Sequence, residues 1–221
     1  MAGIRRVRRG RRLMGAPQHG QHAGTDEREV KLAVAEGFVL PRLDQLDAVT
    51  VVDRGDQMLD AAYWDTTDLA LANAGVGVRH RNGVWTFKGR SRRERDAVVR
   101  EELEIEGHPA SFPPQLRERL SEWAAVGALQ QVARLRTRRH QVDVQSSTGS
   151  AELVHDRVSI LDGERQIGRF EEVEVEYPLG SETLADRLVA LLVDHGATRD
   201  STAKYVRALR ALGHHPPEVM L

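Results

Sequence analysis

Apolar and polar residues alternate along several stretches of this chain, in the manner of β-strands. Near the start of the chain, Val30 and Leu32 alternate with Glu29 and Lys31. Successive side chains of a strand point to opposite faces, so the charged residues share one face and the apolar residues share the other. The same alternation recurs in residues 76–81, 85–88, 100–106, 132–144 and 170–177. One such strand is typical of a sheet edge with a solvated face, but the repetition predicts a closed sheet whose lumen is the charged side.

Helical spacing and turn residues predict the remaining elements. Apolar residues at helical spacing, with proline or polar residues at the entry, predict helices at residues 41–46, 69–74, 113–125, 181–196 and 201–212. Asn82-Gly83 and Asp162-Gly163 predict hairpin turns. Arg54-Gly55-Asp56 predicts a third hairpin turn, and residues 152–156 and 158–161 predict two short strands. Residues 91–96 are expected to form a charged loop.

Length and composition predict one folded domain with a tail at each end. A chain of 221 residues is long enough for one domain with a sizeable core. Residues 1–24 contain six arginines, five glycines and no acidic residue, with almost no apolar periodicity, so we expect a disordered tail there. The folded domain is expected at residues 25–213, followed by a frayed C-terminus at 214–221.

Charge and residue content exclude several classes of protein. The net charge is −1, and because residues 1–24 hold six arginines and no acid, the rest of the chain carries −7. An acidic domain argues against nucleic-acid binding, which needs an excess of surface lysine and arginine. The absence of cysteine excludes disulfides, thiolate zinc sites and cysteine nucleophiles. No stretch approaches the roughly 18 apolar residues of a membrane span, and the arginine-rich start lacks a secretory core, so a cytoplasmic protein is expected. Monomer and homodimer both remain open.

The charged faces point to a polyphosphate and a metal ion. Glu172, Glu174 and Glu176 share one strand face, where like charges repel unless cations lie between them. Carboxylates without imidazole or thiolate suit Mg²⁺ or Mn²⁺, which also bridge to phosphates. Lysine and arginine meet phosphate oxygens directly. The alternative is a set of internal salt bridges, which stabilise a fold poorly because desolvation offsets their attraction.

One candidate cation cannot be chosen from the pattern alone. Arg136 and Arg138 share a strand face and Arg139 points to the other, because adjacent residues of a strand face opposite sides. Alternation does not say which of the two faces is the lumen.

The order of these motifs resembles a known family. Glu27-x-Glu29-x-Lys31 resembles the signature of the CYTH family, the triphosphate tunnel metalloenzymes, which include class IV adenylate cyclases and thiamine triphosphatases. The resemblance spans nearly all of residues 25–210. It continues in order through Tyr63-Trp64-Asp65-Thr66, Arg79-x-Arg81, Trp85-Thr86-Phe87-Lys88, Arg100-Glu101-Glu102, residues 136–139, Asp156-Arg157-Val158, Glu172-x-Glu174-x-Glu176 and Lys204-Tyr205. It implies an α+β fold, a roughly eight-stranded antiparallel barrel that forms a triphosphate tunnel with helices packed outside, and it favours Arg139 as the inward arginine.

The resemblance also implies roles for individual residues. It implies metal ligands at Glu27, Glu29, Glu102, Asp156, Glu172, Glu174 and Glu176. It implies phosphate contacts from Lys31, Arg79, Arg81, Lys88, Arg100, Arg139 and Lys204. Glu27, Glu29 and Lys31 are the expected catalytic residues, and Lys31 would either contact phosphate or orient or deprotonate the attacking water. The implied reaction is in-line attack of metal-activated water on the terminal phosphorus, without a covalent intermediate.

Three functions fit such a tunnel. Metal-dependent hydrolysis of inorganic tripolyphosphate is the first expectation, while thiamine triphosphate, nucleoside triphosphates and the 5′ end of RNA present the same triphosphate. A class IV-type adenylate cyclase is the first alternative, in which the substrate's own 3′ hydroxyl replaces water; the sequence shows no base-recognition motif. The second alternative is a non-catalytic module that binds polyphosphate.

Overall fold

The computed structural model describes residues 25–95 and 97–216. The predicted tail at 1–24 and the last five residues of the predicted frayed end lie outside the described residues. The strands are β1 (Thr25–Val34), β2 (Val49–Asp65), β3 (Gly77–Arg81), β4 (Val84–Lys88), β5 (Arg92–Glu94), β6 (Ala97–Glu106), β7 (Gln130–Ser146), β8 (Gly149–Asp162), β9 (Arg165–Glu176) and β10 (Thr198–Arg199). The helices are α1 (Ala70–Ala74), α2 (Pro114–Leu120), α3 (Glu182–Asp194) and α4 (Lys204–Ala211), with short 3-10 turns at Leu43–Gln45 and Val126–Ala128.

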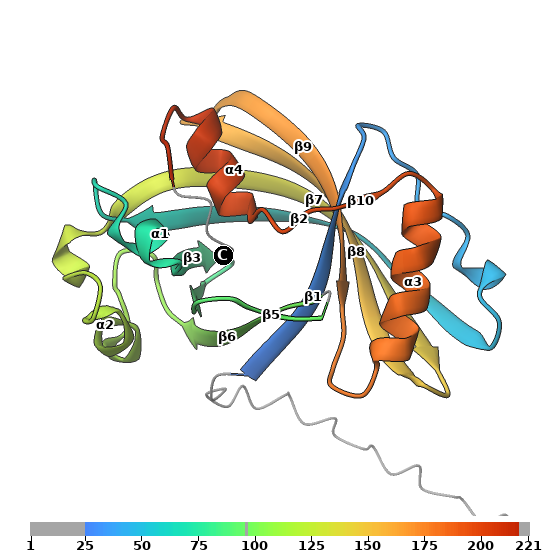
Figure 1. Ribbon diagram of the computed structural model, residues 1–221. Coiled ribbons are helices and arrows are strands. Elements are labelled where there is room, and N and C mark those ends of the chain that lie inside the picture. Colours follow the sequence, from blue (N-terminus) through green and yellow to red (C-terminus); the bar gives the residue numbers. More distant parts are fainter. Residues whose placement is uncertain (1–24, 96, 217–221) are drawn as a thin grey trace, which may run out of the picture.

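The strands close into an antiparallel barrel (Figure 1). Their order is β1-β9-β8-β7-β2-β3-β4-β6, and β6 pairs again with β1 to complete the circle. The short strands β5 and β10 pair at the margins with β6 and β1. The expected eight-stranded antiparallel barrel with helices packed around it is therefore confirmed.

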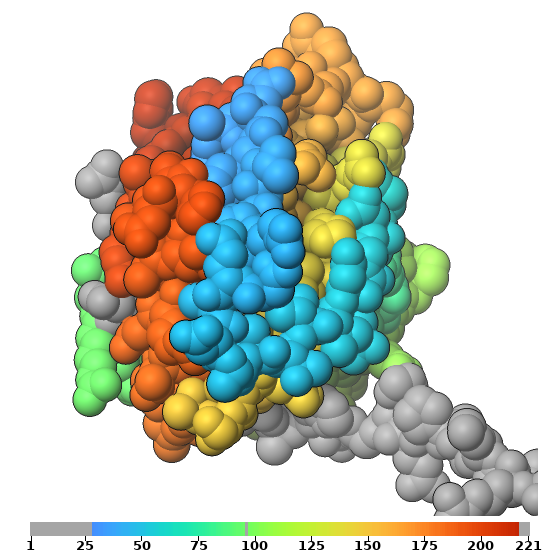
Figure 2. All heavy atoms as spheres, turned by 90° about the vertical axis from the view of Figure 1, so that its right-hand side faces the viewer, coloured from blue at the N-terminus to red at the C-terminus, as the bar shows by residue number. Residues whose placement is uncertain are grey.

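Much of the apolar core lies on the outer surface of the barrel. The leucine stripe of α3 packs on outward residues such as Leu32 and Val173, and the segment between β1 and β2 covers the same face (Figure 2). Around the other side, α2 packs Leu116 and Leu120 against Trp85. Each fully buried side chain of this size contributes about 1.5–3 kcal/mol relative to an exposed one. Because these faces are used for packing, much of the inner face is left for polar chemistry.

The last helix packs differently, over inward-facing residues at one end of the barrel. Tyr205 and Leu209 of α4 belong to a buried cluster with Tyr63 and Leu135. Leu135 lies on the same face of β7 as Arg139, because the two positions are four residues apart and side chains of a strand alternate between its faces. The first residue of α4, Lys204, consequently reaches the lumen.

Two predicted breaks between strands, at residues 54–56 and at residue 157, are wrong. Residues Arg54-Gly55-Asp56 do not form a hairpin, because β2 runs through them and stays paired with β7. The chain bulges there: Gly55 has φ +79°, and its N–H donates to the Asp53 carboxylate at 2.7 Å. Residues 152–156 and 158–161 are likewise parts of one strand, β8, because β7 and β9 offer it continuous partners. The predicted charged loop at 91–96 contains the short strand β5.

The predicted hairpin at Asn82-Gly83 is confirmed. Both residues have positive φ, 52° and 81°, as a two-residue turn between twisted strands requires. This turn sets Arg79 opposite Thr86 and Gly77 opposite Lys88, so it brings the cations of β3 and β4 to one wall of the barrel.

Candidate functional site

The barrel encloses a cavity of about 410 Å³. Most of the predicted site residues that the structure describes line it: Glu29, Lys31, Arg79, Arg81, Lys88, Arg100, Glu102, Arg139, Asp156, Glu174, Glu176 and Lys204. Glu172 lies in the wall beside them, fully buried, and contacts both lumen lysines. Glu27 stands opposite Arg100 in the β1–β6 pairing, and its side chain lies outside the described part of the structure.

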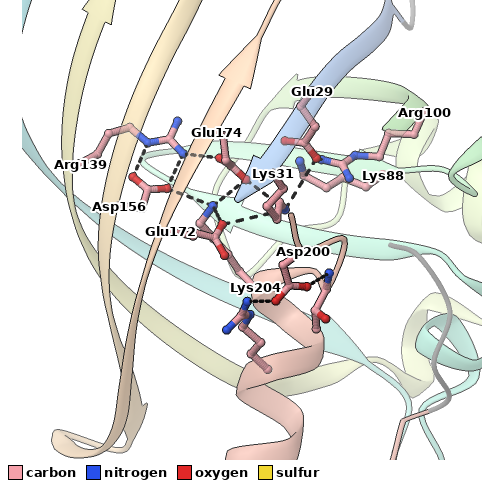
Figure 3. A network of polar contacts seen from close by, with 12 residues as sticks. Glu29, Lys31, Lys88, Arg100, Arg139, Asp156, Glu172, Glu174, Asp200 and Lys204 are labelled. Carbon is pink, nitrogen blue, oxygen red and sulfur yellow. Dashed lines mark hydrogen bonds and ion pairs between the residues drawn. The ribbon is translucent and has the colours of Figure 1, made fainter. Parts of the chain in front are cut away.

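Strand register explains why these residues meet. Residues directly opposite each other in neighbouring strands point to the same face. Lys31 on β1 is opposite Glu174 on β9. Arg139 on β7 is opposite Asp156 on β8, which in turn is opposite Glu172 on β9. The charges therefore form continuous rows across the inner wall, and Figure 3 shows them pointing toward one another from several strands and from α4.

Two buried lysines lie among the acids. Lys31 Nζ is 3.0 Å from Glu174, 3.7 Å from Glu29 and 3.9 Å from Glu172. Lys204 Nζ is 3.0 Å from Asp156 and 2.9 Å from Glu174, and it also pairs with Glu172. Burial alone would lower the pKa of Lys31, but the surrounding carboxylates outweigh it and raise that pKa. Both lysines are therefore ammonium ions at neutral pH.

The structure decides which arginine of β7 faces the lumen. Arg139 donates two hydrogen bonds to Asp156, at 2.8 and 2.7 Å, and contacts Glu174 at 3.2 Å. Arg136 and Arg138 point to the outer surface, where they bind Asp60 and Asp56. The arginine favoured by the family resemblance is the one that lines the cavity.

The wall formed by β1, β4 and β6 carries a second set of pairs. Arg100 is 2.8 Å from Glu29 and donates to Glu102 at 2.9 Å. Lys88 also donates to Glu102. Glu29 and Arg100 are buried, so the pair is shielded from solvent.

Cations dominate the wall formed by β3. Arg79 donates to Thr86 Oγ1 at 3.1 Å and lies 3.9 Å from Glu104. Arg81 forms no ion pair with a carboxylate of the described residues, and the neighbouring Arg79, burial and Arg139 lower its pKa to about 10. A cation that other cations crowd in this way favours an anionic ligand.

The acids of β9 differ in their protonation. Burial raises the pKa of Glu174, but Lys204 and Lys31 outweigh it and hold that pKa well below its ordinary value. Burial, Glu174 and Glu29 raise the pKa of Glu176 to about 7. The two neighbouring inward positions of one strand thus hold an ionised carboxylate and one that exchanges its proton near neutral pH.

The acids fit a hard divalent cation. Two sets bring carboxylate oxygens within 4.8 Å of one another, Glu29 with Glu174 and Glu176, and Asp156 with Glu172 and Glu174. Glu172 is fully buried, and its carboxylate pairs with Lys204 and lies 3.9 Å from Lys31 Nζ. An all-carboxylate set is the donor chemistry of Mg²⁺ and Mn²⁺ and suits zinc or copper less well.

Two further acids line the cavity that the sequence prediction did not include. Glu104 follows Glu102 by two residues on β6, and Glu152 precedes Asp156 by four on β8. Strand alternation was a sufficient signal for both, since an even spacing from an inward residue keeps the same face. Glu152 was left out although residues 152–156 were predicted as a single strand that contains both Glu152 and Asp156.

The comparison with family models decides the family. The CYTH domain model matches residues 26–207. This chain belongs to the CYTH domain family. No curated protein matches the chain. The CYTH family is enzymatic and metal-dependent, and the two acid sets described above supply candidate metal ligands in this chain.

Solved structures share the fold of this CYTH barrel. A candidate adenylate cyclase from Bacillus halodurans is 16% identical, with 81% of this chain and 94% of that chain covered and a TM-score of 0.55. A candidate adenylyl cyclase from Hippeastrum, described as having a dominant triphosphatase activity, is 19% identical, with 87% and 99% covered and a TM-score of 0.52. None of the helices in the described part of this CYTH protein has the length and apolar character to cross a membrane.

Proposed function

We propose that this protein is a metal-dependent triphosphatase and that inorganic tripolyphosphate is its substrate. The observation that carries the proposal is the division of the cavity between an acidic and a cationic wall. Asp156, Glu172 and Glu174 lie on one wall. Arg79 and Arg81 lie on another, where the nearest ion pair is the 3.9 Å contact of Arg79 with Glu104 among the described residues. A linear triphosphate can meet both walls at once, directly at the arginines and through a cation at the acids.

The carboxylates would hold Mg²⁺ or Mn²⁺. Glu29, Glu174 and Glu176 form one candidate ligand set, Asp156 and Glu172 extend it through Glu174, and Glu27 and Glu102 remain predicted ligands. Such an ion, when bound, supplies charge neutralisation at the phosphoryl oxygens and a lowered pKa for a water molecule.

The cations of the chain would bind and orient the phosphates. Arg79, Arg81 and Lys88 are placed to contact oxygens on the cationic side, and Lys31 and Lys204 to contact those on the acidic side. Because its pKa is raised, Lys31 stays protonated, which supports a phosphate-contacting and water-orienting role over the removal of a proton from water. These ammonium and guanidinium groups would also stabilise charge on the phosphoryl oxygens during in-line attack.

The cavity favours an inorganic triphosphate over a nucleotide. Tyr63 and Tyr205 are the aromatic residues among its described lining, and they stack on each other at 5.1 Å with little exposed surface. A nucleobase therefore finds no free ring on which to stack. The triphosphatase activity described for the Hippeastrum protein is consistent with the same choice.

One assay separates the three functions. Purified protein is incubated with Mg²⁺ or Mn²⁺ and either tripolyphosphate or ATP, and the products are identified. We expect orthophosphate from tripolyphosphate, slower turnover of ATP, and no turnover in excess chelator. Cyclic AMP and pyrophosphate as main products would instead establish a cyclase, and retention of tripolyphosphate without products would establish a binding module.

The affinity for Mg²⁺ or Mn²⁺ should rise with pH through about 7, because Glu176 must lose a proton before it can act as a ligand. The raised pKa means that the metal-free folded state binds this proton more tightly than the unfolded state. The stability that Glu176 contributes without metal is thus present below its ordinary pKa and is lost as pH rises through about 7. Calorimetry in buffers of different ionisation enthalpy measures the protons released on binding. Glu176→Gln should reduce that release, with the remainder coming from Glu172, whose pKa burial also raises. Unchanged release would contradict the assignment.

A further inference from the structure

The position of Lys204 depends on how α4 begins. Lys204 is the first residue of the helix, and its ammonium reaches Asp156 and Glu174 from there. The preceding Ala203 offers no side chain that could cap the helix. A flexible lysine stem on an uncapped helix start loses much conformational freedom when it is held in one place. Asp200 holds the chain just before this turn, since its carboxylate accepts the Thr202 N–H at 2.6 Å and pairs with Arg207 of α4. Tyr205 fixes the first turn itself.

Tyr205, the next residue, is held firmly. Its hydroxyl donates a hydrogen bond of 2.6 Å to Asp65 Oδ2, and its ring lies on that of Tyr63 at 5.1 Å with an interplanar angle of 9°. The side chain is almost fully buried. Burial and the nearby Asp65 raise the pKa of the hydroxyl, so it remains a donor at neutral pH.

Asp65 is in turn fixed to the barrel. It is the last residue of β2 and is completely buried. Its carboxylate accepts the backbone N–H groups of Thr66, Leu71 and Ala72 at 2.7, 2.9 and 3.0 Å, two of them from the first turn of α1. The carboxylate thus caps α1 and binds α4 through Tyr205, and α1, the barrel wall and α4 meet at one side chain.

We propose that Asp65 and Tyr205 are positioning residues that hold Lys204 in the triphosphate cavity. The inference rests on the proposed function for its consequence in catalysis, but the placement of Lys204 can be tested apart from it. Without the Tyr205 hydroxyl, the ring still packs on Tyr63, while the first turn of α4 is free to shift. A shift of about 1 Å at a substrate-contacting group can lower the rate by about a hundredfold.

Chemical labelling tests the placement directly. The metal-free protein is treated with an amine-acylating reagent, and acylation of Lys204 is followed by peptide mass spectrometry with Lys88 as the internal reference. Tyr205→Phe should raise the rate for Lys204 relative to Lys88 about tenfold. Tyr63→Phe is the matched control for labelling, because it removes the other hydroxyl of the stacked pair and leaves the bond to Asp65 intact. Equal labelling of Lys204 in wild type and Tyr205→Phe would overturn the proposal.

A double-mutant cycle tests the catalytic consequence. Tyr205→Phe should lower kcat/KM for tripolyphosphate about ten- to a hundredfold in the wild-type background and have little effect in a Lys204→Met background. A purely structural role would lower it equally in both backgrounds and would overturn the proposal. Asp65→Asn, which keeps the shape of the side chain, should follow the same pattern with a larger loss of thermal stability. If the wild type hydrolyses no triphosphate while the labelling responds as expected, the proposed function fails and the positioning of Lys204 stands.

Discussion

Replacing Glu174 with glutamine should lower kcat/KM for tripolyphosphate by at least about a thousandfold. This carboxylate belongs to both candidate metal-ligand sets. It also contacts Lys31 at 3.0 Å, Lys204 at 2.9 Å and Arg139 at 3.2 Å. A neutral amide would weaken the ligand set and release three cations from their common partner. Steady-state kinetics at saturating Mg²⁺ or Mn²⁺ measure the loss.

The control for this variant is Glu118→Gln, which makes the same chemical change on the exposed surface of α2. It should leave kcat/KM unchanged. Calorimetry of Glu174→Gln should also show weakened binding of the metal ion. Near-normal turnover combined with normal metal affinity would show that Glu174 is not a metal ligand, whatever the identity of the substrate.

Lys31→Met should destabilise the metal-free protein by about 3–5 kcal/mol, as expected when one partner of a buried ionic network is removed. Lys31 is only 7% exposed and lies within 4 Å of Glu29, Glu172 and Glu174. Without its charge, these carboxylates, each with less than 5% of its surface exposed, repel one another. Urea unfolding in the presence of chelator gives the free energy of unfolding.

A divalent cation should recover part of this loss, because it replaces the missing positive charge among the same carboxylates. Lys88→Met serves as the comparison, since Lys88 is more exposed and its ion pair is with Glu102 on another wall. It should lose less stability and gain less from metal. If Lys31→Met were as stable as the wild type in chelator, the charge of Lys31 would not be required to stabilise the buried carboxylates of β9.

The faces of single strands could be predicted from sequence because they depend on local geometry alone. The two-residue period of a strand was enough to set Glu29 with Lys31 and Glu172 with Glu174. It was enough for Glu104 as well, although that residue was left out. In each case the information lies within a few neighbouring residues, and no knowledge of partner strands is needed.

Features that depend on a partner strand or a distant residue could not be derived in this way. The choice of Arg139 over Arg138 depends on which face of β7 meets Asp156. The turn expected at Gly55 is a bulge because β7 continues to pair on both sides of it. Asp65 and Tyr205 are 140 positions apart, and nothing in either local pattern indicates that they bond.

In much of the barrel wall, charged residues point inward and apolar residues point outward, so the function of each position in a strand depends on a two-residue alternation. On β9, Glu172, Glu174 and Glu176 lie on the lumen side, while Val173 and Val175 pack beneath α3. Inserting a single residue after Val173 would shift the alternation by one position. The glutamates after the insertion would then face the leucines of α3, and Val175 would face the lumen. One event would damage chemistry and stability together. We therefore expect insertions to be tolerated at strand ends, and substitutions at inward positions to alter ligand preference without disturbing the packing beneath α3.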